Sequence, residues 1–180
     1  MGKKSALLVI DMQVNIVKDA YYRDQVLDTI HTLLGHARGT DTPVMYVQHE
    51  GWKGERLEAG TPGWQIHPAI SPQKGEPVVH KRACDAFHQT SLQQELERRG
   101  IDRLVVVGAF TDYCVATSVR RATTCGYDVT LVSDGHTTKD NEILTAEQVI
   151  AYHNALLNGF GTGSSTITVK PTHEITFSNP

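Results

Sequence analysis

The chain has 180 residues, with 17 Lys plus Arg against 20 Asp plus Glu and a formal net charge of -3. That balance excludes a basic nucleic-acid-binding surface and a polybasic membrane-surface protein. The longest apolar runs, 6–10 and 104–110, are far too short to span a membrane. We therefore expect one soluble domain over residues 1–180 that folds without a metal or disulfide framework and, since no targeting signal is evident, is cytoplasmic.

Apolar strands alternate with amphipathic helices along the chain. Strands are predicted at 5–10, 43–48, 77–80, 103–107, 127–132 and 166–169. Helices are predicted at about 24–38, at 91–99 before Gly100, from a Thr111 or Asp112 cap to about 125, and at 145–157. This order predicts an α/β fold, with a three-layer, doubly wound, mainly parallel six-stranded sheet and helices on both faces.

The stretch from His49 to Gly75 fits no helix or strand and is rich in Gly and Pro. A long insertion at the end of a strand is more often functional than idle. We therefore expect this stretch to shape a binding site.

Several reactive side chains fall where predicted strands end. Asp11, Gln48 and Lys81 each end a strand, and Cys114 enters the first turn of a helix after the fourth strand. Ligands of open α/β sheets bind beyond the carboxyl ends of the strands. Taken singly, each residue has an ordinary interpretation as a cap, a solvated charge or a core cysteine.

The combination of three of these residues is more specific than any one of them. A nucleophilic cysteine needs a lowered pKa, which a helix N-terminus and a nearby Lys81 can supply, and a proton acceptor such as Asp11. The turn can also aim backbone N–H groups at a developing oxyanion. Cys114 is therefore the candidate nucleophile, and the other two cysteines, Cys84 and Cys125, are expected to be structural.

Several motifs, in order and with their spacing kept, resemble the isochorismatase-like cysteine hydrolases, which include nicotinamidases and N-carbamoylsarcosine amidase. The matching stretches are 7–13 (LLVIDMQ), 60–68 (GTPGWQIHP), 79–81 with 85–87, 107–115 (VGAFTDYCV), and 126–129 with 133–135. The resemblance covers nearly the whole chain.

The resemblance implies a role for each matching residue. Cys114 would be the nucleophile, Asp11 the acid and base that carries its proton to the leaving amine, and Lys81 the cation near both. It also implies a cis peptide between Ala109 and Phe110 and an oxyanion hole formed by the backbone N–H groups of Phe110 and Cys114. The side chains that we expect to shape the substrate pocket are Gln48, Trp64, His67 and Phe87, with core packing as the alternative for the two aromatic residues.

Metal binding divides the family that the chain resembles. Nicotinamidases hold zinc or a similar ion with an Asp and two His, but residues 48–50 read Gln-His-Glu here, so that ligand set is incomplete. We expect no required metal and no other cofactor, and we disfavour nicotinamide as a substrate. A substitute site made of His49, Glu50 and His67 is the alternative.

The resemblance implies hydrolysis of the C–N bond of a small-molecule amide through a cysteine thioester. Two alternatives are a vinyl-ether hydrolase of the isochorismatase type, in which a Gln at the position of Gln48 takes part, and a non-catalytic member that binds a small molecule. Such proteins usually assemble, so a homo-oligomer is expected, with a small-molecule substrate and with neither nucleic acid nor membrane as a partner.

Overall fold

The computed structural model describes residues 3–177, and in it six parallel strands form one sheet in the order β3-β2-β1-β4-β5-β6. The strands are β1 (Ser5–Ile10), β2 (Val44–His49), β3 (Val78–Lys81), β4 (Arg103–Ala109), β5 (Asp128–Thr137) and β6 (Ile167–Lys170). The chain winds outward from β1 to β3 and then restarts at β4 on the other side of β1. This arrangement confirms the predicted doubly wound fold and puts its switch point between β1 and β4.

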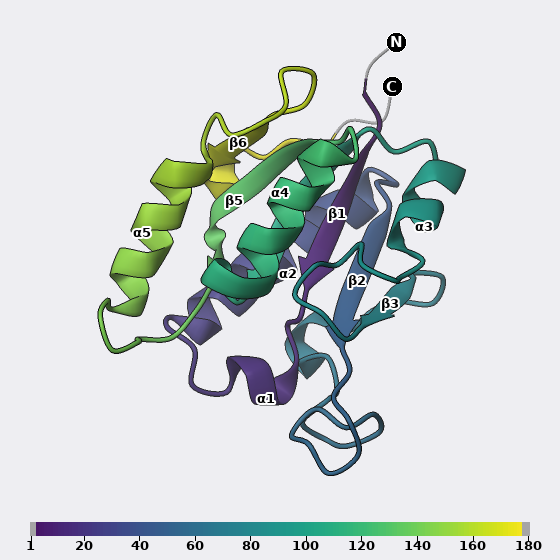
Figure 1. Ribbon diagram of the computed structural model, residues 1–180. Helices are drawn as coiled ribbons and strands as arrows, with labels where there is room; N and C mark the ends of the chain where they lie inside the picture. Colours follow the sequence, from purple (N-terminus) through teal and green to yellow (C-terminus); the bar gives the residue numbers. More distant parts are fainter. Residues whose placement is uncertain (1–2, 178–180) are drawn as a thin grey trace.

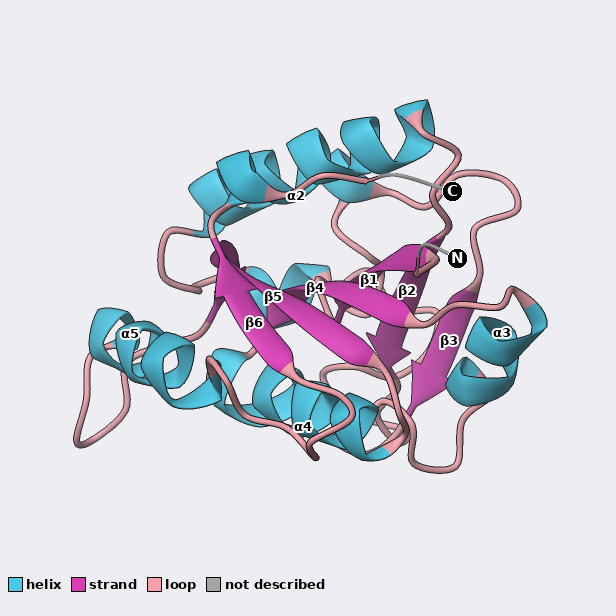
Figure 2. Ribbon diagram, turned by 90° about the horizontal axis from the view of Figure 1, so that it is seen from above, coloured by secondary structure: helices cyan, strands magenta, loops and turns pink. Residues whose placement is uncertain are grey.

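Helices cover both faces of the sheet, as predicted (Figure 2). Helix α2 (Arg23–Gly39) lies on one face, and α3 (Leu92–Arg98), α4 (Ala116–Thr124) and α5 (Ala146–Leu157) lie on the other. A short α1 (Val14–Val17) follows β1. None of the helices within residues 3–177 is both long enough and apolar enough to cross a membrane.

The alternation of side chains along β1 explains the two core layers. Ala6, Leu8 and Ile10 pack with the helices of one face, whereas Leu7 and Val9 pack against α2 on the other. Helix α2 meets that face with residues at helical spacing, namely Val26, Leu27, Ile30, Leu33, Leu34 and Ala37, all of which are buried. A strand buried on both faces reads as a continuous apolar run, which is why β1 is easy to recognise in the sequence.

Gly108 allows β1 and β4 to approach closely where the site begins. It pairs with Ile10, and its φ of 139° lies in a region that side chains rarely adopt. A Cβ atom at this position would lie 2.2 Å from the carbonyl oxygen of Ile10. The glycine thus lets the backbone after β4 lie directly beside Asp11.

The carboxyl ends of the strands share one end of the molecule with α1 and with the loop that follows β2 (Figure 1). Strands β4 and β5 are longer than predicted there, and a π-helical turn, Thr111–Val115, precedes α4. The predicted caps are wrong, because the N-cap is Phe110 and no side chain caps the turn. The hydroxyl of Thr111 instead bonds to His136 on β5, and the carboxylate of Asp112 accepts a bond from Thr138.

Candidate active site

Asp11 follows β1 directly, at the switch point of the sheet. Its φ of 51° lies in the left-handed region, which Asp and Asn adopt more readily than most residues. Its carboxylate is buried, and apart from an ion pair with Lys81 neither oxygen accepts a hydrogen bond from the described residues. The remaining lone pairs are free to accept a proton.

Lys81 is the last residue of β3, and acceptors surround its ammonium group. Nζ lies 2.6 Å from Oδ2 of Asp11, 3.2 Å from Sγ of Cys114 and 2.9 Å from the carbonyl oxygen of Ala83. Burial by itself lowers the pKa of Lys81, but the carboxylate and the sulfur outweigh it, so the pKa is raised. The ammonium therefore stays charged between its two partners.

Cys114 lies in the π-helical turn between β4 and α4 and is half-buried. Its Sγ lies within 4.8 Å of a carboxylate oxygen of Asp11 and of a ring nitrogen of His49. The peptide bond between Ala109 and Phe110 is cis, at the position that the resemblance implies. The structure thus brings Asp11, Lys81 and Cys114 together from the ends of three strands.

The thiol of Cys114 differs from the low-pKa group expected at a helix N-terminus. Burial and the carboxylate of Asp11 raise its pKa, and the ammonium of Lys81 offsets only part of that rise. The expected lowering is wrong for the resting site, because the cation is already paired with a carboxylate that also faces the thiol. A protonated thiol must give up its proton as it attacks, and Asp11 lies beside it.

His49 ends β2 and faces the same three groups. Burial and the charge of Lys81 lower the pKa of His49, so its ring is neutral at neutral pH. Since the ammonium can only donate, Nδ1 of His49 accepts from Lys81 at 3.3 Å, and Nε2 carries the proton. Gln13 holds this residue in place, because its Oε1 accepts from the N–H of His49 and its Nε2 donates to the carbonyl oxygen.

The residues that could substitute for a zinc site do not gather. Glu50 forms an ion pair with Arg82 at the surface. The ring of His67 accepts a hydrogen bond from the backbone N–H of Ala69. Among the described residues, neither Glu50 nor His67 is grouped with His49 at metal-ligand spacing. The alternative site of His49, Glu50 and His67 is therefore not formed.

Another trio has ligand-like spacing. Asp11, His49 and Cys114 each offer one atom, and these atoms lie within 4.8 Å of one another. All three groups also contact the ammonium of Lys81. A metal ion at their centre would have to displace this buried cation, so the donor set does not fit a resident metal.

A cavity of about 510 Å³ lies over the triad, with Asp11 and Cys114 in its lining. Its apolar wall consists of Ile16 from α1, Leu57 from the loop after β2, and Phe110 and Tyr113. The last two belong to residues 110–115, which we call the nucleophile turn after the candidate nucleophile Cys114. The loop was expected to shape a binding site, but none of these four side chains was identified from the sequence, since Phe110 was expected to act through its backbone. For Tyr113 the sequence holds a signal, since it directly precedes Cys114; in the structure its side chain is exposed.

The four side chains expected to shape the pocket lie outside the lining of this cavity. They are Gln48, Trp64, His67 and Phe87. The buried Gln48 donates to the carbonyl oxygen of Trp64, whose ring stacks on His80, and Phe87 stacks on Tyr127 in the core. Three of these side chains thus contact the loop after β2, a neighbouring strand or the core, and the role of all four as substrate-pocket residues stays a prediction.

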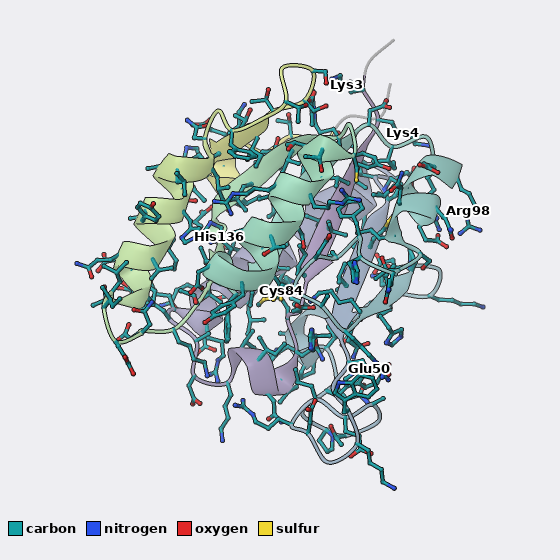
Figure 3. All side chains as sticks on the ribbon, in the orientation of Figure 1. Lys3, Lys4, Glu50, Cys84, Arg98 and His136 are labelled. Carbon is teal, nitrogen blue, oxygen red and sulfur yellow. The ribbon has the colours of Figure 1, made fainter. Side chains whose placement is uncertain are left out.

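Cys84 is also placed differently from the expectation. It is exposed and lines the same cavity as Cys114. Its carbonyl oxygen accepts a bond from Ser118 on α4, and Figure 3 labels it beside the lower end of that helix. Cys84 is therefore a pocket residue, whereas Cys125 lies at the C-cap of α4 and packs against the core.

A buried network fixes the start of the nucleophile turn. The ring of His136 bonds through Nδ1 to the hydroxyl of Thr111 at 2.8 Å and through Nε2 to Oδ1 of Asn154 at 2.9 Å. Since the amide of Asn154 donates to Ser133, its Oδ1 accepts from Nε2–H, and Nδ1 accepts from the threonine. The network thus requires a neutral ring, joining β5 and α5 to the turn that carries Cys114.

This network makes stability depend on pH. Burial lowers the pKa of His136 to about 4, so as pH falls from about 6.5 the unfolded chain takes up this proton before the folded chain does. We expect His136 to remove about 3 kcal/mol from the free energy of unfolding between these pH values. Urea denaturation of wild type and of His136→Gln at both pH values isolates the part of this loss that His136 causes. The contributions of His49 and His67 to the pH dependence are the same in both proteins and cancel. Equal losses in the two proteins would contradict a buried neutral ring.

Comparisons with known proteins give one family match and several relatives. Residues 5–155 match the family described as Isochorismatase domain. Streptothricin hydrolase of Streptomyces noursei is 36% identical over 138 residues, which cover 75% of this chain and 50% of the relative. The chain thus spans about half the length of that relative.

A second relative and a solved structure match over most of their length. Nicotinamidase 3 of Arabidopsis thaliana is 30% identical over 156 residues, which cover 79% of this chain and 77% of the relative. The crystal structure of an isochorismatase from Pseudomonas putida KT2440 superposes with a TM-score of 0.88 at 30% identity, covering 97% of this chain and 92% of that chain.

Proposed function

The chain belongs to the isochorismatase family, and we propose that it is a hydrolase that cleaves the C–N bond of a small amide through a thioester on Cys114. The observation that carries this proposal is the position of the Lys81 ammonium, 2.6 Å from the carboxylate of Asp11 and 3.2 Å from Sγ of Cys114, beneath an open cavity. Two relatives support hydrolysis by their names, a streptothricin hydrolase and a nicotinamidase.

The first half of the reaction forms the acyl-enzyme. Sγ of Cys114 attacks the amide carbon while the carboxylate of Asp11 takes the thiol proton, which avoids a free thiolate in a site that raises the thiol pKa. The tetrahedral oxyanion accepts hydrogen bonds from the backbone N–H groups of Phe110 and Cys114. Asp11 then passes its proton to the nitrogen, the C–N bond breaks, and the amine leaves a thioester.

The second half restores the enzyme. Asp11, again a carboxylate, takes a proton from a water molecule as its oxygen attacks the thioester carbon. The C–S bond breaks, the acid product leaves, and the proton returns from Asp11 to Cys114. Throughout, Lys81 holds the carboxylate in place and stabilises negative charge as it develops on sulfur.

The test combines turnover with detection of the intermediate. A panel of small amides is assayed by ammonia release, and rapidly quenched samples are examined by mass spectrometry for an acyl group on the peptide that contains Cys114. We expect turnover together with an adduct at that residue alone. Turnover of a vinyl ether without any adduct would favour the isochorismatase-type reaction, and binding without turnover would contradict an enzymatic role.

A further inference from the structure

Two cationic side chains that do not belong to the triad line the cavity. Arg56 comes from the loop after β2, and Lys139 follows the carboxyl end of β5. They share the cavity with the apolar wall and with Asp11, which is the only acidic residue in the lining among residues 3–177. Because Asp11 is already paired with Lys81 at 2.6 Å, the charges of Arg56 and Lys139 have no counter-charge within the lining.

Arg56 is held in position by a reciprocal contact with Asn15. Nη2 of Arg56 donates to the carbonyl oxygen of Asn15 at 2.8 Å, and the side-chain amide of Asn15 donates to the carbonyl oxygen of Arg56 at 3.0 Å. This is the one hydrogen bond of the guanidinium to the residues that the structure describes, which leaves most of its N–H donors free. A fixed guanidinium with free donors is suited to bind a carboxylate.

Lys139 lines the same cavity and lies beside Phe110. Its Nζ is 5.7 Å from the centre of the Phe110 ring and 3.7 Å from a carboxylate oxygen of Asp19. Asp19 is 73% exposed, so this ion pair is screened by solvent and weak. The ammonium makes no hydrogen bond to any residue between 3 and 177 and can turn to a ligand in the cavity.

We propose that the substrate is a small amide with an apolar body and a carboxylate, and that Arg56 and Lys139 bind this carboxylate while the amide carbon faces Cys114. The proposal rests on the proposed function for the amide. The carboxylate preference follows from Arg56 and Lys139, because Asp11, the acidic residue of the described cavity lining, is already paired with Lys81. A positively charged amide would meet like charge at both positions and would be disfavoured.

The charge preference can be measured without turnover. Cys114 is alkylated with iodoacetate, an anion, and with iodoacetamide, its neutral analogue, and peptide mass spectrometry follows the rate at Cys114 separately from Cys84. The ratio of the iodoacetate rate to the iodoacetamide rate at Cys114 is divided by the same ratio for the thiol of glutathione, which corrects for the different intrinsic reactivity of the two reagents. We expect a normalised preference for iodoacetate of about tenfold, which decreases at high salt and is mostly lost in the Arg56→Ala/Lys139→Ala double variant.

The control must remove the same charge from elsewhere. The Lys18→Ala/Lys53→Ala double variant also removes two positive charges, from exposed residues that do not line the cavity. Lys53 lies in the same loop as Arg56. It is expected to keep the wild-type ratio. If the Arg56→Ala/Lys139→Ala variant also kept that ratio, the preference would belong to Lys81 alone and the proposal would be overturned.

Hydrolysis gives a second readout. The half-amides of succinic and glutaric acid are compared with their methyl esters by ammonia release. We expect the KM of the acids to be at least tenfold lower than that of the esters. Removing Arg56 or Lys139 should raise the KM of the acids by a similar factor and change kcat little. Equal KM values for acids and esters would contradict the carboxylate site, whereas absence of any amide turnover would contradict the proposed function and leave the alkylation result to decide the charge preference.

Discussion

Replacing Cys114 with alanine is expected to abolish amide hydrolysis and to leave the fold intact. Without the sulfur no thioester forms, and Asp11 and Lys81 have no nucleophile to activate, so kcat should fall by about 10⁴-fold or more. The side chain is half-buried and small, so the free energy of unfolding should change by no more than about 1 kcal/mol. Ammonia release and urea denaturation measure the two effects.

The other two cysteines provide matched controls. Cys125→Ala makes the same substitution at the C-cap of α4 and should leave both kcat and KM near wild type. Cys84→Ala changes the lining of the cavity and should alter KM more than kcat. Retained turnover in Cys114→Ala would show that the chemistry does not depend on this thiol. Loss of turnover in Cys125→Ala would show that removing any cysteine disturbs the enzyme, and the effect at Cys114 would not be specific.

That Asp11, Lys81 and Cys114 lie close together could be predicted from the sequence because each of them is tied to a strand end. In a doubly wound parallel sheet the carboxyl ends of the strands meet at one edge, so residues just after apolar runs become neighbours. Asp11 and Lys81 are such residues, and Cys114 follows the next strand by a short turn. The order of apolar strands and helices was enough to place them.

The cavity wall could not be predicted in the same way. Arg56 and Leu57 belong to a loop without periodicity, and Lys139 lies beyond a strand whose last residues are polar, so nothing in the local pattern shows which way they face. For Trp64 and Phe87 the residue type alone does not separate the alternatives, because an aromatic side chain can line a pocket, stack on a loop residue such as His80, or pack in the core.

Burial explains why the ionisation of Cys114 and the role of His136 could not be predicted from the sequence. The raised pKa of Cys114 and the lowered pKa of His136 both follow from loss of solvent, which a sequence does not display. His136 also lies on residues that extend β5 beyond its apolar part. Its hydrogen bonds to Thr111 and Asn154 join segments far apart in the chain.

Replacing Lys81 with methionine is expected to lower the free energy of unfolding by about 3–5 kcal/mol, in addition to removing activity. Methionine resembles the lysine stem in length and can pack in its place. The carboxylate of Asp11 would then remain buried, with none of the described residues donating a hydrogen bond to it. The cost arises from an unpaired buried charge and not from a cavity.

The double variant Asp11→Asn/Lys81→Met separates these two causes. Asparagine tolerates the left-handed backbone at position 11 and removes the charge, so the double variant should recover much of the stability lost by Lys81→Met. In a double-mutant cycle measured by urea denaturation at pH 7, we expect a coupling of at least about 2 kcal/mol. The two single variants, Asp11→Asn and Lys81→Met, and the double variant should all lack hydrolysis, because each lacks the proton carrier, the cation or both. Additive losses would mean that the two charges do not compensate each other, and the role of Lys81 in holding Asp11 as a base would have to be abandoned.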